Sequence, residues 1–225
     1  MHNPRSGNVV IFVLIAVMLF AALAYTFMRG SREGTGNLSA QQAKIQSSEM
    51  INYAQSVERA IDKLRSKGCS ETQLSFDYDI PATTGYENPN SPGDYSCHIF
   101  HPNGGGITYA ASPISGSSWF FITSFVFEVG EDKGWCSDAR CNDLLMMLAG
   151  LSLQTCQFIN STIQGSTSTN NQDNGTAYDT TGTKFIGDFS DGQPDIEMGS
   201  NPNKESGCIR GTDNKYYFFR AVLPR

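Results

Sequence analysis

Six cysteines are the residues of this sequence whose chemistry is easiest to anticipate, and all of them follow a long apolar run near the start of the chain. They are Cys69, Cys97, Cys136, Cys141, Cys156 and Cys208. An even number of cysteines beyond such a run is typical of disulfides in an exported domain. No two of them have the C-x₂-C spacing of a zinc site. A cysteine nucleophile would need a free thiol, and six paired half-cystines leave none.

The pairing of these cysteines stays open, because six of them can connect in many ways and sequence alone does not choose. The pairs that we expect are Cys69–Cys97, Cys136–Cys141 and Cys156–Cys208. The first would join the end of a helix to a sheet. The second would close the short surface loop WCSDARC. The third would join the carboxyl-terminal strand to a helix.

A second candidate site is the acidic, turn-rich run from Gly187 to Glu197. Oxygen ligands on a loop suit Ca²⁺. The candidate ligands are Asp188, Asp191, Asp195 and Glu197. Their spacing is not that of an EF-hand, and a solvated turn explains the same residues equally well. Both interpretations therefore stay open.

His98 and His101 form an H-x-x-H pattern in a stretch predicted to be a strand. Residues three apart on a strand face opposite sides, so we do not expect these two rings to converge on a metal. The sequence also lacks a G-x-S-x-G elbow, a phosphate-binding P-loop and an H-E-x-x-H motif. We therefore expect no catalytic residues, no cofactor and no enzymatic activity.

The charge balance argues against one class of partner. The net charge is −6 and only 17% of the residues are charged. A nucleic-acid-binding surface would need a basic stripe, so we expect no nucleic-acid partner. The abundance of Gly, Ser, Thr and Asn is typical of an extracellular surface.

The most prominent feature of the sequence is the uncharged apolar run Val9–Met28. A helix of about 20 residues is about 30 Å long, the thickness of the hydrocarbon core of a bilayer. The sequence therefore predicts a leader over residues 1–7 and a transmembrane helix over residues 8–29. Arg5, Arg29 and Arg32 barely decide the orientation of this helix, but the cysteines favour an exported head.

Three interpretations of this amino-terminal stretch are open. It is a permanent signal anchor, or a secretory signal peptide cleaved after the small-x-small tripeptide Ala22-Leu23-Ala24. In the third interpretation, the order Arg5-Ser6-Gly7, followed at once by Asn8 and the apolar helix, resembles the prepilin peptidase site of type IV pilins and type II secretion pseudopilins. The resemblance covers the first third of the chain. Most pilins have Glu at the fifth mature position, where this chain has Phe12, but some minor pseudopilins also lack it.

The resemblance implies that prepilin peptidase cleaves between Gly7 and Asn8 and that the helix remains on the mature protein. The helix would first lie in the bacterial inner membrane, with the head in the periplasm. It would then join other pilin-like subunits, or further copies of itself, through Val9–Met28 in a filament at the cell surface.

The remaining sequence predicts one head domain over residues 39–225. Three glycines in the segment 30–38 predict a linker that breaks the helix. A second helix is expected from about residue 40 to residue 67, with Ser39 as its N-cap and Gly68 at its end. The apolar positions expected on this helix are Ala43, Ile45, Met50, Tyr53, Ala54, Val57, Ala60, Ile61 and Leu64.

Short strands and loops are expected beyond Cys69. The predicted strands are Leu74–Tyr78, Cys97–His101, Ile107–Tyr109, Trp119–Val129 and Lys215–Leu223, the second and third forming a hairpin around the Gly104–Gly106 run. Asp143–Leu148 and Leu151–Ile163 are predicted to be helical, and the polar run Gly165–Thr183 a loop. The fold class is thus α+β, with an antiparallel sheet packed on the amphipathic helix and a head stapled by disulfides.

These features predict a structural subunit, pilin-like or pseudopilin-like, of a bacterial surface filament or secretion pseudopilus. The alternative is a single-pass protein, anchored in the membrane, whose head binds a ligand outside the cytoplasm.

Overall fold

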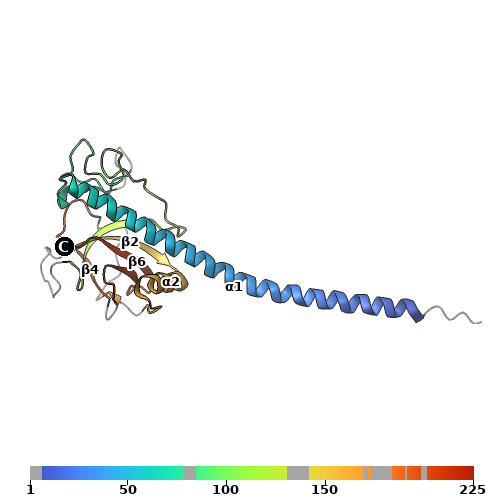
Figure 1. The fold of residues 1–225 in the computed structure, drawn as a ribbon. Coiled ribbons are helices and arrows are strands. Elements are labelled where there is room, and N and C mark those ends of the chain that lie inside the picture. The colour runs from blue at the N-terminus through green and yellow to red at the C-terminus, as the bar shows by residue number, and fades with distance from the viewer. Residues whose placement is uncertain are drawn as a thin grey trace, which may run out of the picture. The chain divides into compact units, whose positions relative to one another are not determined.

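The computed structural model describes residues 7–78, 85–130, 142–169, 172–173, 184–190, 192–198 and 202–225, and it has an α+β fold. The chain divides into two compact units, Met1–Gln42 and Ala43–Arg225. One long helix, α1 (Gly7–Ser66), contributes its first part to the first unit and its later part to the second (Figure 1).

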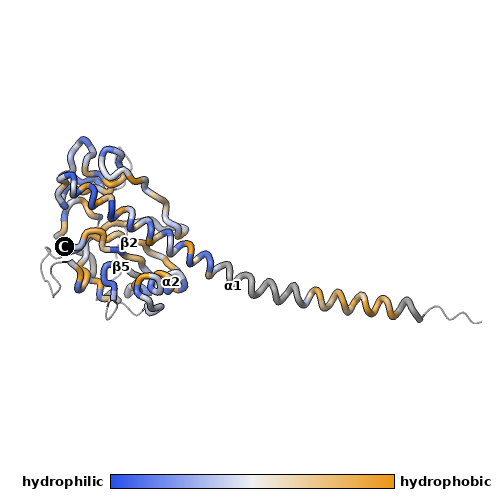
Figure 2. Tube along the Cα trace, viewed as in Figure 1, coloured by the Kyte–Doolittle hydropathy of each residue, from blue (hydrophilic) through white to orange (hydrophobic). Residues whose placement is uncertain are grey.

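The first part of α1 is apolar and exposed. The large apolar side chains from Ile11 to Tyr25 are at least half exposed, from 51% for Ile15 to 77% for Phe20, and Figure 2 shows this stretch as the most hydrophobic part of the helix. The helix continues through residues 30–38, so the predicted break in that segment was wrong. A glycine costs a helix only about 1 kcal/mol relative to alanine. Three such costs do not interrupt a helix that is already formed on both sides.

The later part of α1 buries one apolar stripe, as its spacing predicts. Met50, Ala54, Val57, Ile61 and Leu64 have no exposed surface. Ile45 is the exception, since 59% of its side chain is exposed. The stripe packs against one face of the sheet and forms with it the larger of two core clusters.

The end of α1 is a Schellman motif, which confirms the predicted stop at Gly68. Gly68 has φ +97°, a left-handed conformation that a residue with a Cβ rarely adopts. The N–H of Gly68 donates to the carbonyl of Arg65 at 3.0 Å, and the N–H of Cys69 donates to the carbonyl of Leu64 at 3.1 Å. These two bonds satisfy carbonyls that the last turn of a helix leaves free.

Six strands close into a barrel in the order β1-β2-β6-β5-β3-β4 among the residues that the structure describes. They are β1 (Phe120–Val126), β2 (Asp143–Leu151), β3 (Gln172–Asp173), β4 (Gly192–Glu197), β5 (Ser206–Arg210) and β6 (Tyr216–Leu223). The pairings β1–β2, β2–β6, β5–β6 and β3–β4 are antiparallel. The pairings of β4 with β1 and of β3 with β5 are parallel. The sheet is therefore mixed, where the sequence predicts an antiparallel one.

Both faces of this sheet are buried, which explains one wrong prediction. In β2, Leu144 and Met146 belong to the cluster that includes α1, whereas Leu145 and Met147 belong to the second cluster, with Ile122, Ile209 and Phe219. A strand buried on both faces has no alternation of apolar and polar residues. Its continuous run LLMML therefore resembles a buried helix segment, and the helix predicted over Asp143–Leu148 was wrong.

The other long predictions for the second half of the chain were confirmed. The strand predicted over Trp119–Val129 is β1, and the strand predicted over Lys215–Leu223 is β6. The helix predicted over Leu151–Ile163 is α2 (Leu153–Gln164). Its N-cap is Ser152, whose hydroxyl accepts a hydrogen bond from the N–H of Thr155, and it ends at Gly165 with φ +68°.

The strands predicted in the segment 74–109 do not form. The described residues of this segment have one isolated bridge, between Ser75 and His98, and the short 3₁₀ helix η1 (Glu71–Gln73) precedes them. The glycine run makes close backbone contacts in place of a hairpin turn. A Cβ on Gly104 would lie 2.1 Å from the carbonyl oxygen of His98, and one on Gly105 would lie 2.4 Å from that of Ile99. The glycines signal this close approach, which sequence alone does not distinguish from a turn.

Candidate functional site

The first candidate site is the apolar part of α1 itself. Its side chains from position 11 to position 25 are exposed around the whole helix. A contiguous apolar surface of this kind marks a site of association with another protein or with lipid. Among the residues that the structure describes, no helix combines the length and hydrophobicity needed to cross a membrane.

The predicted processing site lies at the start of this helix. Gly7 is the first residue of α1 and Asn8 the second, while residues 1–6 lie outside the described part of the chain. Phe12 is 71% exposed. Ala21 and Ala24 are exposed on the same stretch, and they are small enough to let a neighbouring helix approach closely.

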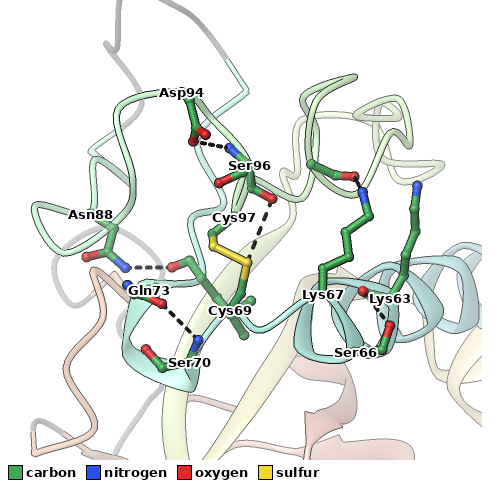
Figure 3. Close-up of a disulfide and its surroundings, with 12 residues drawn as sticks. Lys63, Ser66, Lys67, Cys69, Ser70, Gln73, Asn88, Asp94, Ser96 and Cys97 are labelled. Carbon is green, nitrogen blue, oxygen red and sulfur yellow. Dashed lines mark hydrogen bonds between the residues drawn. A yellow bond between two sulfur atoms is a disulfide. The ribbon is translucent and has the colours of Figure 1, made fainter.

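Two of the three expected disulfides are present. Cys69–Cys97 joins the end of α1 to the loop that precedes β1, with 5.8 Å between the Cα atoms, and Figure 3 shows this bridge with Lys63 and Lys67 nearby. Cys156–Cys208 joins α2 to β5, with 5.3 Å between the Cα atoms. Cys136 and Cys141 lie outside the described residues.

Both disulfides are surrounded by hydrogen bonds that hold the same pairs of segments. The side-chain amide of Asn160, on α2, donates to the carbonyl of Cys208 at 2.9 Å and accepts from its N–H at 2.8 Å. Near the other bridge, Lys67 donates to the carbonyl of Gly104 at 3.3 Å, and Lys63 donates to that of Gly105 at 2.9 Å. The cysteines therefore reinforce contacts that the polar side chains already make.

The calcium hypothesis gains no support from the geometry. The carboxylate of Asp188 accepts a hydrogen bond from the N–H of Ser190 at 2.8 Å, and the contacts with Ser190 lower its pKa. Asp195 lies in β4, where burial raises its pKa. Glu197, two residues further on, is exposed, and Asp191 is outside the described residues. No three His, Cys, Asp or Glu residues in the described ranges are grouped so as to hold a metal ion.

The two histidines are closer together than the strand prediction implied. Their rings lie 6.5 Å apart, and each contacts Tyr95, at 5.0 Å for His98 and 4.7 Å for His101. Because residues 97–101 form turns and no strand, the rings do not face opposite sides. Burial lowers the pKa of His98, which favours the neutral imidazole.

A second candidate site, which sequence reasoning missed, is a cavity of about 400 Å³ between the later part of α1 and the loop that precedes β1. Its lining residues are Glu49, Asn52, Tyr53, Ser56, Ala110, Ala111, Pro113 and Trp119. The helical residues among them could be found from their i, i+3, i+4, i+7 spacing. The loop that completes the cavity has no periodic pattern, so nothing in the sequence places it there.

Comparison with known proteins gives no family for this chain. No family model matches the sequence, and neither a curated protein nor a solved structure shows significant similarity to it.

Proposed function

We propose that this chain is a pilin-like or pseudopilin-like structural subunit of a bacterial surface filament or secretion pseudopilus. The observation that carries the proposal is that the two parts of α1 present different surfaces. Its first part exposes apolar side chains around the whole helix, and its later part is built into the core of the head through the stripe from Met50 to Leu64. One helix thus offers an apolar surface for association and carries a folded domain.

In this proposal the apolar surface is never left in water. Exposed apolar area costs about 25 cal/mol per Å² relative to burial, so side chains such as Phe12 and Phe20 require a cover. The run Val9–Met28 would first be covered by the lipid of the inner membrane and then by the same helices of neighbouring subunits. Replacing contacts with lipid by contacts with other helices gains little hydrophobic free energy. Close packing at small residues and an assembly machine must therefore drive the transfer of the helix into the filament.

The proposal includes processing by prepilin peptidase between Gly7 and Asn8. It rests on the Arg5-Ser6-Gly7 leader, which ends at the first residue of α1, directly before Asn8 and the apolar run. The head, with its disulfides Cys69–Cys97 and Cys156–Cys208, would fold in the periplasm, where disulfides form and persist.

The second candidate function is that of a membrane-anchored binding protein, and the cavity beside Trp119 favours it. Both functions can also coexist, since the cavity lies within Ala43–Arg225 and the association surface within the first unit.

The deciding experiment changes the fit of the helix and keeps its hydrophobicity. Ala21→Leu combined with Ala24→Leu enlarges two side chains on one helix face. If the chain assembles, the double variant should reach the membrane fraction but disappear from the sheared surface fraction. Val13→Leu combined with Val17→Leu is the matched control, because it adds leucines at positions that already carry large side chains. Wild-type protein that never reaches the sheared fraction, when expressed with its own neighbouring genes, would leave the anchored binding protein as the better function.

A further inference from the structure

The cavity beside Trp119 has a polar wall and an apolar wall. The polar wall is α1, which contributes Glu49, Asn52 and Ser56 from one helix face. The apolar wall is the loop with Ala110, Ala111 and Pro113. The aromatic rings of Tyr53 and Trp119 complete the lining, with 5.4 Å between their centroids. A volume of about 400 Å³ falls within the range of small-molecule sites in proteins.

Hydrogen bonds hold the loop against the helix without any ligand. The hydroxyl of Tyr53 accepts from the N–H of Ala110 at 2.9 Å and donates to the carbonyl of Thr108 at 3.4 Å. The side-chain amide of Gln46 donates to the carbonyl of Pro113 at 3.0 Å. The loop is therefore fixed at both of its ends, and a ligand would bear little of the free-energy cost of ordering the site.

Several polar groups around the cavity are available to a ligand. Glu49 and Asn52 are exposed. The indole N–H of Trp119 is buried and has no acceptor among the described residues. Trp119 lines the cavity, and a buried donor without a partner is costly, so an oxygen atom of a ligand or of a water molecule that reached this N–H would relieve that cost.

The lining also restricts the charge of the ligand. Glu49 is the single charged residue among the described residues that line the cavity. A carboxylate with no basic neighbour repels phosphates and other anions. It accepts hydrogen bonds from hydroxyl groups, and the amide of Asn52 both donates and accepts. The ligand that uses all these groups carries several hydroxyls, has an apolar face for the aromatic rings and the loop, and has no negative charge.

We infer that this cavity binds a neutral saccharide of one or two sugar units. Glu49 and Asn52 hydrogen-bond its hydroxyl groups, and Tyr53, Trp119 and Pro113 contact its apolar face. The inference does not depend on filament assembly, because every residue of the site lies in the unit Ala43–Arg225.

The test is a titration of the full chain, purified in a detergent without a sugar head group, against glucose, galactose, N-acetylglucosamine and their neutral disaccharides. Saturation-transfer NMR should detect millimolar binding of at least one of them. Glu49→Gln and Asn52→Ala should each weaken this binding about tenfold, the effect of losing one or two hydrogen bonds. Asp62→Asn removes another exposed carboxylate of α1 outside the cavity and should leave binding unchanged.

Tyr53→Phe is a second, independent variant. It keeps the ring but removes the hydroxyl that holds the loop, so it too should weaken binding. Thermal unfolding of each variant shows whether the fold is retained, which we expect for Glu49 and Asn52 because both are exposed. The inference is overturned if none of the saccharides binds, if the folded variants bind as well as wild type, or if only a small cation such as N-acetyl-lysine methylamide binds.

Discussion

The carboxylate of Asp143 accepts a hydrogen bond at 2.8 Å from the backbone N–H of Arg225. It also accepts one at 3.1 Å from the N–H of Val126, so it connects the end of β1, the start of β2 and the segment after β6. Asp143 has no exposed surface. Burial raises its pKa to about 7, although both hydrogen bonds act in the opposite direction.

We predict that this carboxyl group makes the folded state more stable as the pH falls. Its pKa in the folded state, about 7, exceeds its ordinary value of 3.8. Between these values the folded protein binds a proton that the unfolded chain releases. The stabilisation is therefore complete below the ordinary pKa of 3.8 and is lost as the pH rises through the folded-state pKa of about 7. The free energy of unfolding changes by a few kcal/mol over this range. Chemical denaturation at pH 5 and pH 8 measures it.

Asp143→Asn should remove this pH dependence, and the exposed Asp62→Asn should retain it. The comparison with wild type isolates Asp143 from His98, whose pKa burial lowers and whose effect has the opposite sign. An unchanged difference in stability between pH 5 and pH 8 in Asp143→Asn would contradict the prediction.

A second prediction concerns the glycine run of the loop before β1. Gly104→Ala places a Cβ 2.1 Å from the carbonyl oxygen of His98, so the backbone must shift. We expect a loss of about 1–3 kcal/mol in the free energy of unfolding, the usual cost of overpacking. Gly93→Ala is the matched control, because its Cβ would meet no atom within 4 Å. Equal stability of the two variants would show that the close contact is absent.

A third prediction concerns the disulfide between α2 and β5. Cys156 and Cys208 are 52 residues apart, and in the chain-entropy model a bridge of that length stabilises by about 4 kcal/mol. Replacing both by serine should lower the melting temperature. Alkylation of wild type without reductant should label none of Cys69, Cys97, Cys156 and Cys208, and peptide mapping should recover each as the expected pair. Labelling of several of these thiols would refute oxidation of the head.

A fourth prediction tests processing. Mass spectrometry of the native protein should find its amino terminus at Asn8, because the leader ends at Gly7 directly before the apolar helix. An intact Met1 would favour a permanent anchor. A start at Tyr25 would instead favour cleavage after Ala24 by signal peptidase.

The sequence predicts those elements of the fold whose signal is periodic. The stripe from Met50 to Leu64, the helix end at Gly68 and the strand ending at Leu223 each follow from spacing or from one conformational requirement. The strand over Leu144–Leu148 could not be recognised, because burial on both faces removes its alternation. Closure of the barrel depends on pairing of β4 with β1, whose partners lie about 70 positions apart and leave no local pattern.

Of the two candidate sites, one can be predicted from the local sequence and the other cannot. The association surface is visible in the sequence, since an unbroken apolar run is a local property. The cavity depends on Tyr53 meeting Ala110, a contact between residues 57 positions apart. The expected pairs Cys69–Cys97 and Cys156–Cys208 were confirmed, although Cys97 lies in a loop and not in the strand that the sequence predicts.

The attachment of α1 to the head has a mechanical consequence. Arg220 of β6 donates two hydrogen bonds to Glu58 of α1, at 3.0 and 2.6 Å, in the middle of the buried stripe. One turn beyond Leu64, Cys69 is bonded covalently to Cys97. Tension applied at the amino terminus would therefore reach the helix–sheet contact first and the covalent bond last. A filament built from such subunits could yield as the helix peels from the sheet turn by turn, and the bridge would then pass the load directly from Cys69 to Cys97, so that residues 70–96 would bear none of it until the disulfide was reduced.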